Sequence, residues 1–137
     1  MQKIAHLGRT MVKNFVTVGS SLDHCHVPGR STDPKERGAL SQSAVEIGMG
    51  IHNEPGAKHI ENKPSGEDLI KEMLELLLRE DDPERSFVKF NKDDDPVLII
   101  NNLGGMSSIE LGAIAAEART QIERDWNLRL SRVYCGT

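Results

Sequence analysis

The spacing of apolar residues along the chain predicts three helices. Apolar positions recur at helical intervals over 2–14, 66–80 and 107–125. The second helix has Ser65 before it as an N-cap and two acidic residues in its first turn. The third begins with the sequence Ser107-x-x-Glu110, which is a capping box. Its buried stripe is expected to consist of Leu111, Ile114, Ala115, Ala118 and Ile122.

Four further segments have the patterns of β-strands. Residues 15–22 are β-branched and apolar, and residues 44–51 alternate apolar and other residues as a half-buried strand does. The continuous apolar run over 97–103 predicts a strand that is buried on both faces, and 128–134 predicts a last strand. The order of elements indicates one α/β domain with a mixed β-sheet and packed helices.

Composition narrows the classes of function. The 137 residues carry a formal net charge of −4 and Lys and Arg are scattered among acids, which argues against nucleic-acid binding. The acidic blocks at 79–82 and 93–95 are interpreted as solvated loop ends, since they lack the spacing of a calcium loop. The sequence shows no signal peptide. It also has no apolar run near the ~18 residues that a membrane-spanning helix needs. Cys25 and Cys135 lie far apart, which suits a reducing compartment, and cytoplasm is expected.

Two histidines at the end of the first predicted strand are the main candidates for chemistry. His24 and His26 are two residues apart, so both imidazoles face one side if the strand continues. With Cys25 or the distant His52 they could ligate a metal, although Cys25 would then point to the other face. They could instead be polar residues whose hydrogen bonds the loop satisfies. As a third alternative, a neutral imidazole has a free lone pair that can add to a ketone or aldehyde carbon.

Two glycine-containing segments are weaker candidates. Residues 46–56 hold three glycines and a proline, which predicts a tight loop whose backbone comes close to another group. Within this loop, His52 and Glu54 either face a site or lie on a surface turn. Residues 101–105 lead from a strand through Gly104-Gly105 to a helix, where backbone N–H groups could hold an anion. A tight turn without a ligand is the preferred interpretation, and no P-loop sequence follows.

Together these segments resemble the dihydroxyacetone (glycerone) kinase family. The matching strings cover 19–29, 45–56 and 97–105, and Phe87-Val88-Lys89-Phe90 resembles the ATP-dependent, eukaryotic-type members. The resemblance extends over nearly the whole chain. It implies the second α/β subdomain of the substrate-binding portion of a glycerone kinase, which phosphorylates dihydroxyacetone.

The resemblance also implies roles for particular residues. The histidine before the Val-Pro step, here His26, would bind dihydroxyacetone covalently as a hemiaminal, and His24 would orient that ring or line the pocket. No metal site is implied in this segment. The family's glycine-rich substrate loop, its acid/base aspartate and its ATP-binding domain have no match here. The segment is therefore expected to bind no cofactor itself, with ATP and Mg²⁺ acting in the full-length enzyme.

The resemblance leaves two alternative interpretations of the chain. In the first, residues 1–137 are a partial substrate-binding domain, truncated at both ends, that supplies the covalent anchor and is inactive alone. In the second, the chain is a truncated non-catalytic module that binds a ketone or a partner. The resemblance also implies pairing into a homodimer.

Overall fold

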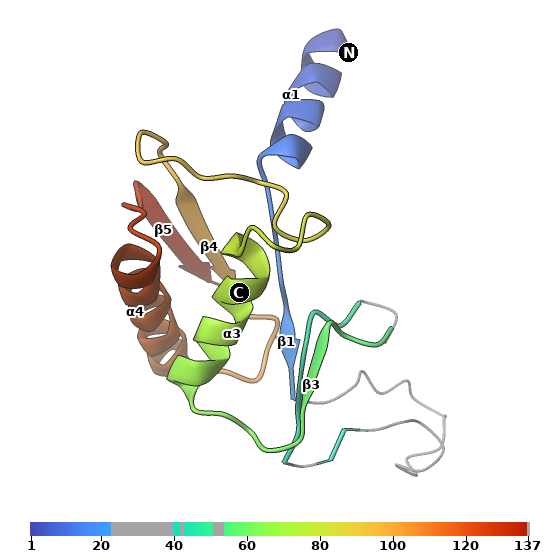
Figure 1. Cartoon of the computed structure of the whole chain (residues 1–137), viewed down its shortest axis with the longest axis vertical. Coiled ribbons are helices and arrows are strands. Elements are labelled where there is room, and N and C mark those ends of the chain that lie inside the picture. Colours follow the sequence, from blue (N-terminus) through green and yellow to red (C-terminus); the bar gives the residue numbers. More distant parts are fainter. Residues whose placement is uncertain (23–39, 42, 51–53, 137) are drawn as a thin grey trace. The chain divides into compact units, whose positions relative to one another are not determined.

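A computed structural model describes residues 1–22, 40–41, 43–50 and 54–136 (Figure 1). The chain divides into two compact units, one formed by Met1–Val16 with Gly66–Thr137 and the other by Thr17–Ser65. Among the described residues, no helix has both the length and the apolar character needed to cross a membrane.

The unit Thr17–Ser65 contains a three-stranded antiparallel sheet. Its strands are β1 (Ser20–Ser21), β2 (Val45–Ile47) and β3 (Lys58–Ile60), and β2 lies between the other two. All three residues of β2 are buried. The sheet therefore has a short, buried central strand and two shorter or more exposed edges.

This sheet differs from the strands that the sequence predicts. The strand expected over 15–22 is reduced to Ser20–Ser21, and the half-buried strand expected over 44–51 is the shorter β2, which is buried throughout. The alternating pattern predicted that Glu46 faces solvent, but Glu46 is buried like its two apolar neighbours in β2. The sequence pattern did not predict β3, since its polar residues pair with β2 through backbone hydrogen bonds that leave little trace in side-chain composition.

The second unit consists of α1 (Gln2–Lys13), α3 (Gly66–Leu78), β4 (Val97–Asn101), α4 (Ser108–Asp125) and β5 (Arg132–Gly136). The two strands pair in parallel and are joined through α4, as parallel strands require a long crossover connection. The three helices predicted from apolar spacing are confirmed to within about two residues at each end. In α1, no residue is buried.

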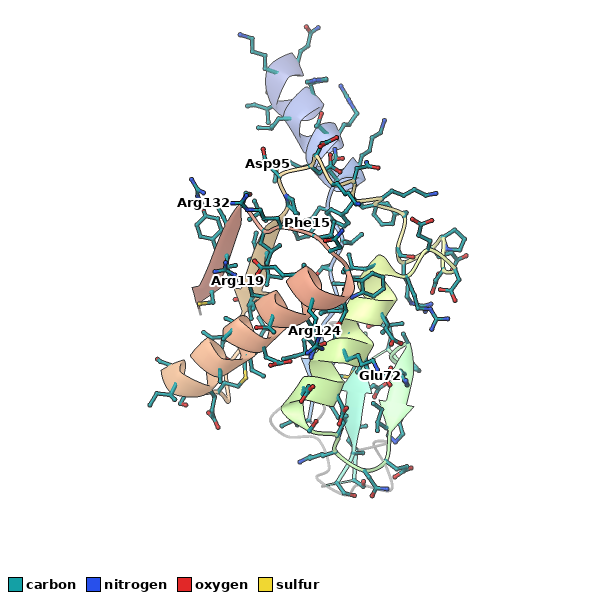
Figure 2. All side chains as sticks on the ribbon, turned by 60° about the vertical axis from the view of Figure 1, so that its left-hand side comes forward. Phe15, Glu72, Asp95, Arg119, Arg124 and Arg132 are labelled. Carbon is teal, nitrogen blue, oxygen red and sulfur yellow. The ribbon has the colours of Figure 1, made fainter. Side chains whose placement is uncertain are left out.

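The core of this unit lies between α3, α4 and one face of the parallel strand pair (Figure 2). Its buried centre consists of Ile70, Leu74, Ala118 and Ile122. Partly buried side chains from β4 and from the connection before β5 pack against it: Leu98, Ile100, Leu128 and Leu130. The helical stripes predicted from the sequence thus supply this core.

The prediction that residues 97–103 are buried on both faces is wrong. Leu98 and Ile100 pack on the helices, whereas Val97 and Ile99 are 49% and 60% exposed. The helices cover one face of the strand pair only, and a continuous apolar sequence cannot reveal which faces are covered. The α/β class is confirmed, with the strands divided between one antiparallel and one parallel sheet.

The N-terminus of α4 forms the predicted capping box. The Ser107 hydroxyl accepts from the Glu110 N–H at 3.3 Å, and a Glu110 carboxylate oxygen accepts from the Ser107 N–H at 2.7 Å. We expect Ser107→Ala to lower the free energy of unfolding by about 1 kcal/mol, because the first turn loses this acceptor. Urea denaturation measures the change. The exposed neighbour Ser108 is the matched control; an equal loss in Ser108→Ala would contradict the capping role.

The same capping box predicts a pH dependence. The Ser107 N–H, by donating to the carboxylate, lowers the pKa of Glu110 from its ordinary value. The resulting stabilisation is complete above the ordinary carboxyl pKa and is lost as the pH falls through the lowered pKa. The stability advantage of the native chain over Glu110→Gln should therefore shrink between pH 7 and pH 3 in urea unfolding. A constant difference over this range would show that the carboxylate charge is not involved.

Candidate functional site

The histidines singled out in the sequence, His24, His26 and His52, lie outside the described residues, as does Cys25. The structure therefore leaves their predicted roles untested. It does describe the strands and loops that flank them in the chain. These flanking elements belong to the sheet of the unit Thr17–Ser65.

The chain leaves β1, toward the histidine segment, and leaves β2, toward the glycine-containing loop, at opposite ends of the sheet. Because β1 and β2 are antiparallel, Ser21 at the end of β1 pairs with Glu46, while Ser20 pairs with Ile47 at the end of β2. The Gly48 N–H donates to the carbonyl oxygen of Gly19 at 2.7 Å, directly after this pairing. The sheet thus holds the last residues before the histidine segment in a defined register.

A buried carboxylate closes the loop that follows β2. Glu46 is buried, and its Oε1 accepts a hydrogen bond from the backbone N–H of Gly56. A buried carboxylate is unfavourable unless donors reach it, so this contact ties the end of the loop back onto the strand. The sequence predicted no role for Glu46, since an acid in an alternating strand is expected to face solvent.

Glycine is required at two positions of this loop. Gly48 has φ +78°, in the left-handed region that side chains rarely adopt. At Gly56, an added Cβ would lie 2.5 Å from the Ile47 carbonyl oxygen and 2.7 Å from Glu46 Cγ. The sequence interpretation of a tight loop with a close backbone approach agrees with these contacts, and the approaching group is the chain's own strand β2.

The second glycine-containing segment is closed by the buried side chain of Asn102. Its Nδ2 donates to the Met106 carbonyl oxygen at 2.9 Å, and its Oδ1 accepts from the Gly104 N–H at 3.0 Å. Gly104 and Gly105 both have positive φ. The capping box of α4 engages the N–H groups of Ser107 and Glu110. These internal contacts agree with a tight turn rather than with an anion site.

The acidic block at 79–82 is occupied by local ion pairs. Arg79 Nε donates to Asp81 at 3.0 Å, and Arg85 donates to Asp82 at 2.7 Å. The hydrogen bonds from these guanidinium groups hold the pKa of both aspartates below the ordinary value. Within the part of the chain that the structure describes, no three His, Cys, Asp or Glu side chains lie where they could hold a metal ion.

The arrangement of elements is that of an α/β domain found in dihydroxyacetone kinase chains. The Dak1 domain family matches the chain over residues 1–137, and the chain belongs to this family. The chain is similar to "Dihydroxyacetone kinase 1" of Saccharomyces cerevisiae, with 44% identity over 134 residues, covering 97% of this chain and 22% of the yeast protein. The resemblance stated from the sequence motifs is thereby confirmed.

Two solved structures have the same fold. The chain named "Dihydroxyacetone kinase operon co-activator Dha-DhaQ" has a TM-score of 0.71 at 24% identity, over 98% of this chain and 38% of that one. The dihydroxyacetone kinase from C. freundii, in complex with AMP-PNP and Mg²⁺, has a TM-score of 0.67 at 22% identity, over 91% of this chain and 21% of that one. Like these two structures, the yeast relative is much longer than the region matched: the chain spans about a fifth of its length.

The loop after β2 allows a direct test of the described framework. Gly56→Ala should lower the free energy of unfolding by about 1–3 kcal/mol, because the new methyl group overlaps the Ile47 carbonyl oxygen and the backbone must shift. Thermal or urea unfolding measures the loss. Gly19→Ala, in the same unit, is the matched control, since its Cβ would meet nothing within 4 Å. Equal stability of the two variants would refute the close approach.

Proposed function

We propose that this chain is the part of an ATP-dependent dihydroxyacetone kinase that anchors the ketone substrate, with His26 as the covalent attachment point. The observation that carries the proposal is membership of the Dak1 domain family, together with 44% identity to a yeast protein named dihydroxyacetone kinase. The string Gly19 to Gly29, which contains His26, begins one residue before the strand β1 and includes it.

The chemistry needs only a neutral imidazole and a carbonyl group. One ring nitrogen of His26 uses its lone pair to attack the ketone carbon, so a C–N bond forms and the C=O π bond breaks. The former carbonyl oxygen gains a proton, and the other ring nitrogen loses one. The adduct is a hemiaminal, with no net oxidation or reduction. Glycerol lacks a carbonyl carbon and cannot form this bond, so attachment itself selects the substrate.

Covalent attachment would serve phosphoryl transfer by fixing the position of the substrate hydroxyl. Phosphoryl transfer depends largely on positioning and on stabilisation of charge. A rigid support for the histidine is therefore useful. The paired strand β1 and the loop tied down by Glu46 and Gly56 support the proposal that this unit provides such a support.

We further propose that residues 1–137 act as a portion of the substrate-binding domain and do not turn over substrate alone. The chain covers 22% of the yeast protein, so most of that relative lies outside the part that the chain matches. ATP and Mg²⁺ would be bound by other parts of a full-length enzyme, and that enzyme would act in the cytoplasm as a homodimer. His24 would orient the His26 ring or line the pocket.

A second candidate function is non-catalytic binding of a ketone or of a partner protein. The fold of this chain also occurs in a protein named as an operon co-activator, so the fold alone does not require catalysis. The two functions make different demands on His26. The kinase function requires the imidazole, whereas a protein-interaction module should bind its partner without it.

The test is covalent capture of dihydroxyacetone by residues 1–137. Incubation followed by intact-mass spectrometry should show a mass increase equal to one dihydroxyacetone, because addition releases no atom. The increase should be absent with glycerol and in His26→Ala. His6→Ala, in α1, is the matched control and should retain the adduct. An adduct that persists in His26→Ala would overturn the assignment.

A crystal structure with dihydroxyacetone provides the second measurement. Electron density continuous with the His26 ring would support the anchor. If neither mass nor density shows an adduct on residues 1–137, the same measurement on a full-length relative decides the matter: an adduct there at the matching histidine supports a site completed by other domains, and none rejects the hemiaminal.

A further inference from the structure

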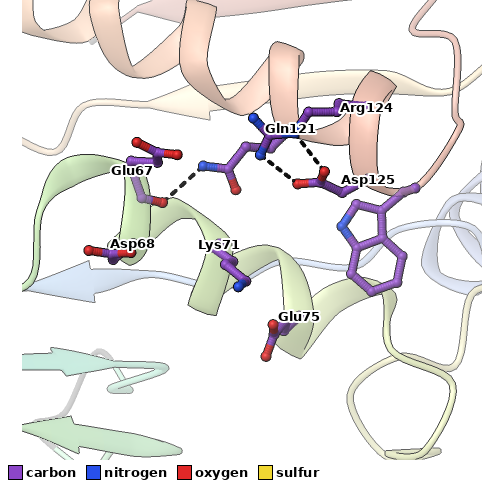
Figure 3. A pocket seen from close by; sticks show the side chains of 8 residues that line it. Glu67, Asp68, Lys71, Glu75, Gln121, Arg124 and Asp125 are labelled. Carbon is purple, nitrogen blue, oxygen red and sulfur yellow. Dashed lines mark hydrogen bonds and ion pairs between the residues drawn. The ribbon is translucent and has the colours of Figure 1, made fainter.

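A groove with a volume of about 330 Å³ lies between α3 and α4 (Figure 3). Both helices belong to the same unit. The lining carries four carboxylate side chains against two cationic ones, so its formal charge is negative. Trp126, the C-cap residue of α4 and the single tryptophan of the chain, also lines it. The groove is separate from the segments considered above.

The floor of the groove contains a polar atom without a partner. Gln121 is 1% exposed, and its Nε2 donates to the Glu67 carbonyl oxygen at 2.9 Å and to Glu117 Oε1 at 2.8 Å. Two acceptors fix the orientation of the amide, because a flipped amide would turn its oxygen toward both. Among the described residues, Gln121 Oε1 has no hydrogen-bond partner. In Figure 3 this oxygen points into the space between α4 and α3.

An unpaired buried acceptor is costly, so this oxygen favours a ligand that donates a hydrogen bond. The nearby cations do not fill that role. Arg124 is engaged with Asp125 through contacts of 2.6 and 2.8 Å, and this pairing keeps the pKa of Asp125 below its ordinary value. The amino group of Lys71 points away from the Gln121 oxygen in Figure 3.

The distribution of acceptors selects the type of donor. The carboxylates of the groove are spread along its wall, and no three of them converge as metal ligands do within the described residues. Spread acceptors suit an organic cation with several N–H groups better than a compact metal ion. The indole of Trp126 adds an aromatic surface, on which ammonium and guanidinium groups are stabilised.

We propose that the α3–α4 groove binds an organic cation bearing N–H donors, an alkylammonium or alkylguanidinium group, with Gln121 Oε1 as the acceptor at its floor. Gln121 lines the groove with this oxygen buried, so binding requires a small shift of the neighbouring side chains that brings an N–H donor within reach of it. The cation comes either from a free amine or from a lysine or arginine side chain of a partner. The proposal is independent of the ketone anchor.

Trp126 fluorescence tests the ligand chemistry on residues 1–137. Titration with n-butylammonium should give a saturable change in emission. Tetramethylammonium has the same charge and no N–H group, so it should bind about tenfold more weakly or worse at equal ionic strength: the indole can still stabilise its charge, but Gln121 Oε1 receives no hydrogen bond. An equal response to both cations, or no response to n-butylammonium and n-butylguanidinium, would overturn the proposal.

Two variants locate the site. Gln121→Met should weaken n-butylammonium binding about tenfold or more, as expected for loss of a hydrogen bond to a charged group. Since Gln121 also links α4 to α3, circular dichroism must show that this variant folds. Lys71→Met keeps the acceptor and removes a positive charge, so binding should tighten about two- to fivefold. Lys92→Met is the matched control outside the groove. Equal affinities of the two lysine variants would contradict the site.

Two further ligands distinguish the sources of the cation. Spermidine represents a free polyamine, and N-acetyl-lysine-N-methylamide represents a lysine side chain within a protein. Tighter binding of spermidine than of n-butylammonium supports a free amine. Equal binding of the blocked lysine and n-butylammonium supports a partner side chain. Failure of both ligands in a protein that binds n-butylammonium overturns assignment to these two sources.

Discussion

The packing of α3 against α4 is the interaction on which the larger unit depends. Ile70 and Leu74 from α3 meet Ala118 and Ile122 from α4, and β4 contributes apolar side chains from one of its faces. Most of the stability of a helix in a protein comes from packing of its apolar face, so burial of these stripes maintains both helices. The hydrogen bond from Gln121 to the backbone of Glu67 joins the same two helices at a polar point. The core and the groove therefore share one support.

The smaller unit is held by a different constraint. Its strands contain only two or three residues each, and its loop after β2 is shaped by backbone geometry. Gly48 adopts a left-handed conformation, and Gly56 comes so close to β2 that a methyl group would overlap it. The buried Glu46 carboxylate receives a backbone N–H at this point. These contacts make the region before and after the candidate histidine segment depend on particular residues rather than on a large apolar core.

The two proposals concern different units of the chain. His26, the proposed ketone anchor, falls within the smaller unit, and the groove proposed to bind a cation lies between two helices of the larger one. The relation to dihydroxyacetone kinases bears on the first, because the matching strings surround His26. The groove rests on charge, burial and an unpaired amide oxygen.

The sequence by itself determined the elements whose signals are local. The helices follow from apolar spacing, and the capping box follows from Ser107 and Glu110, because both depend on residues within one or two turns. The family also follows from the sequence, since the motifs around His26 and Gly104 occur in order. His26 as the anchor remains a prediction, since its segment is outside the described residues.

Only the tertiary structure decided which faces are covered and where polar atoms go. Val97 and Leu98 are both apolar, yet Leu98 packs against the helices and Val97 is exposed. The burial of Glu46 and the unpaired oxygen of Gln121 likewise depend on what packs against them. A sequence pattern records the preference of each side chain for water. It does not record contacts between residues far apart in the chain, and those contacts determine burial.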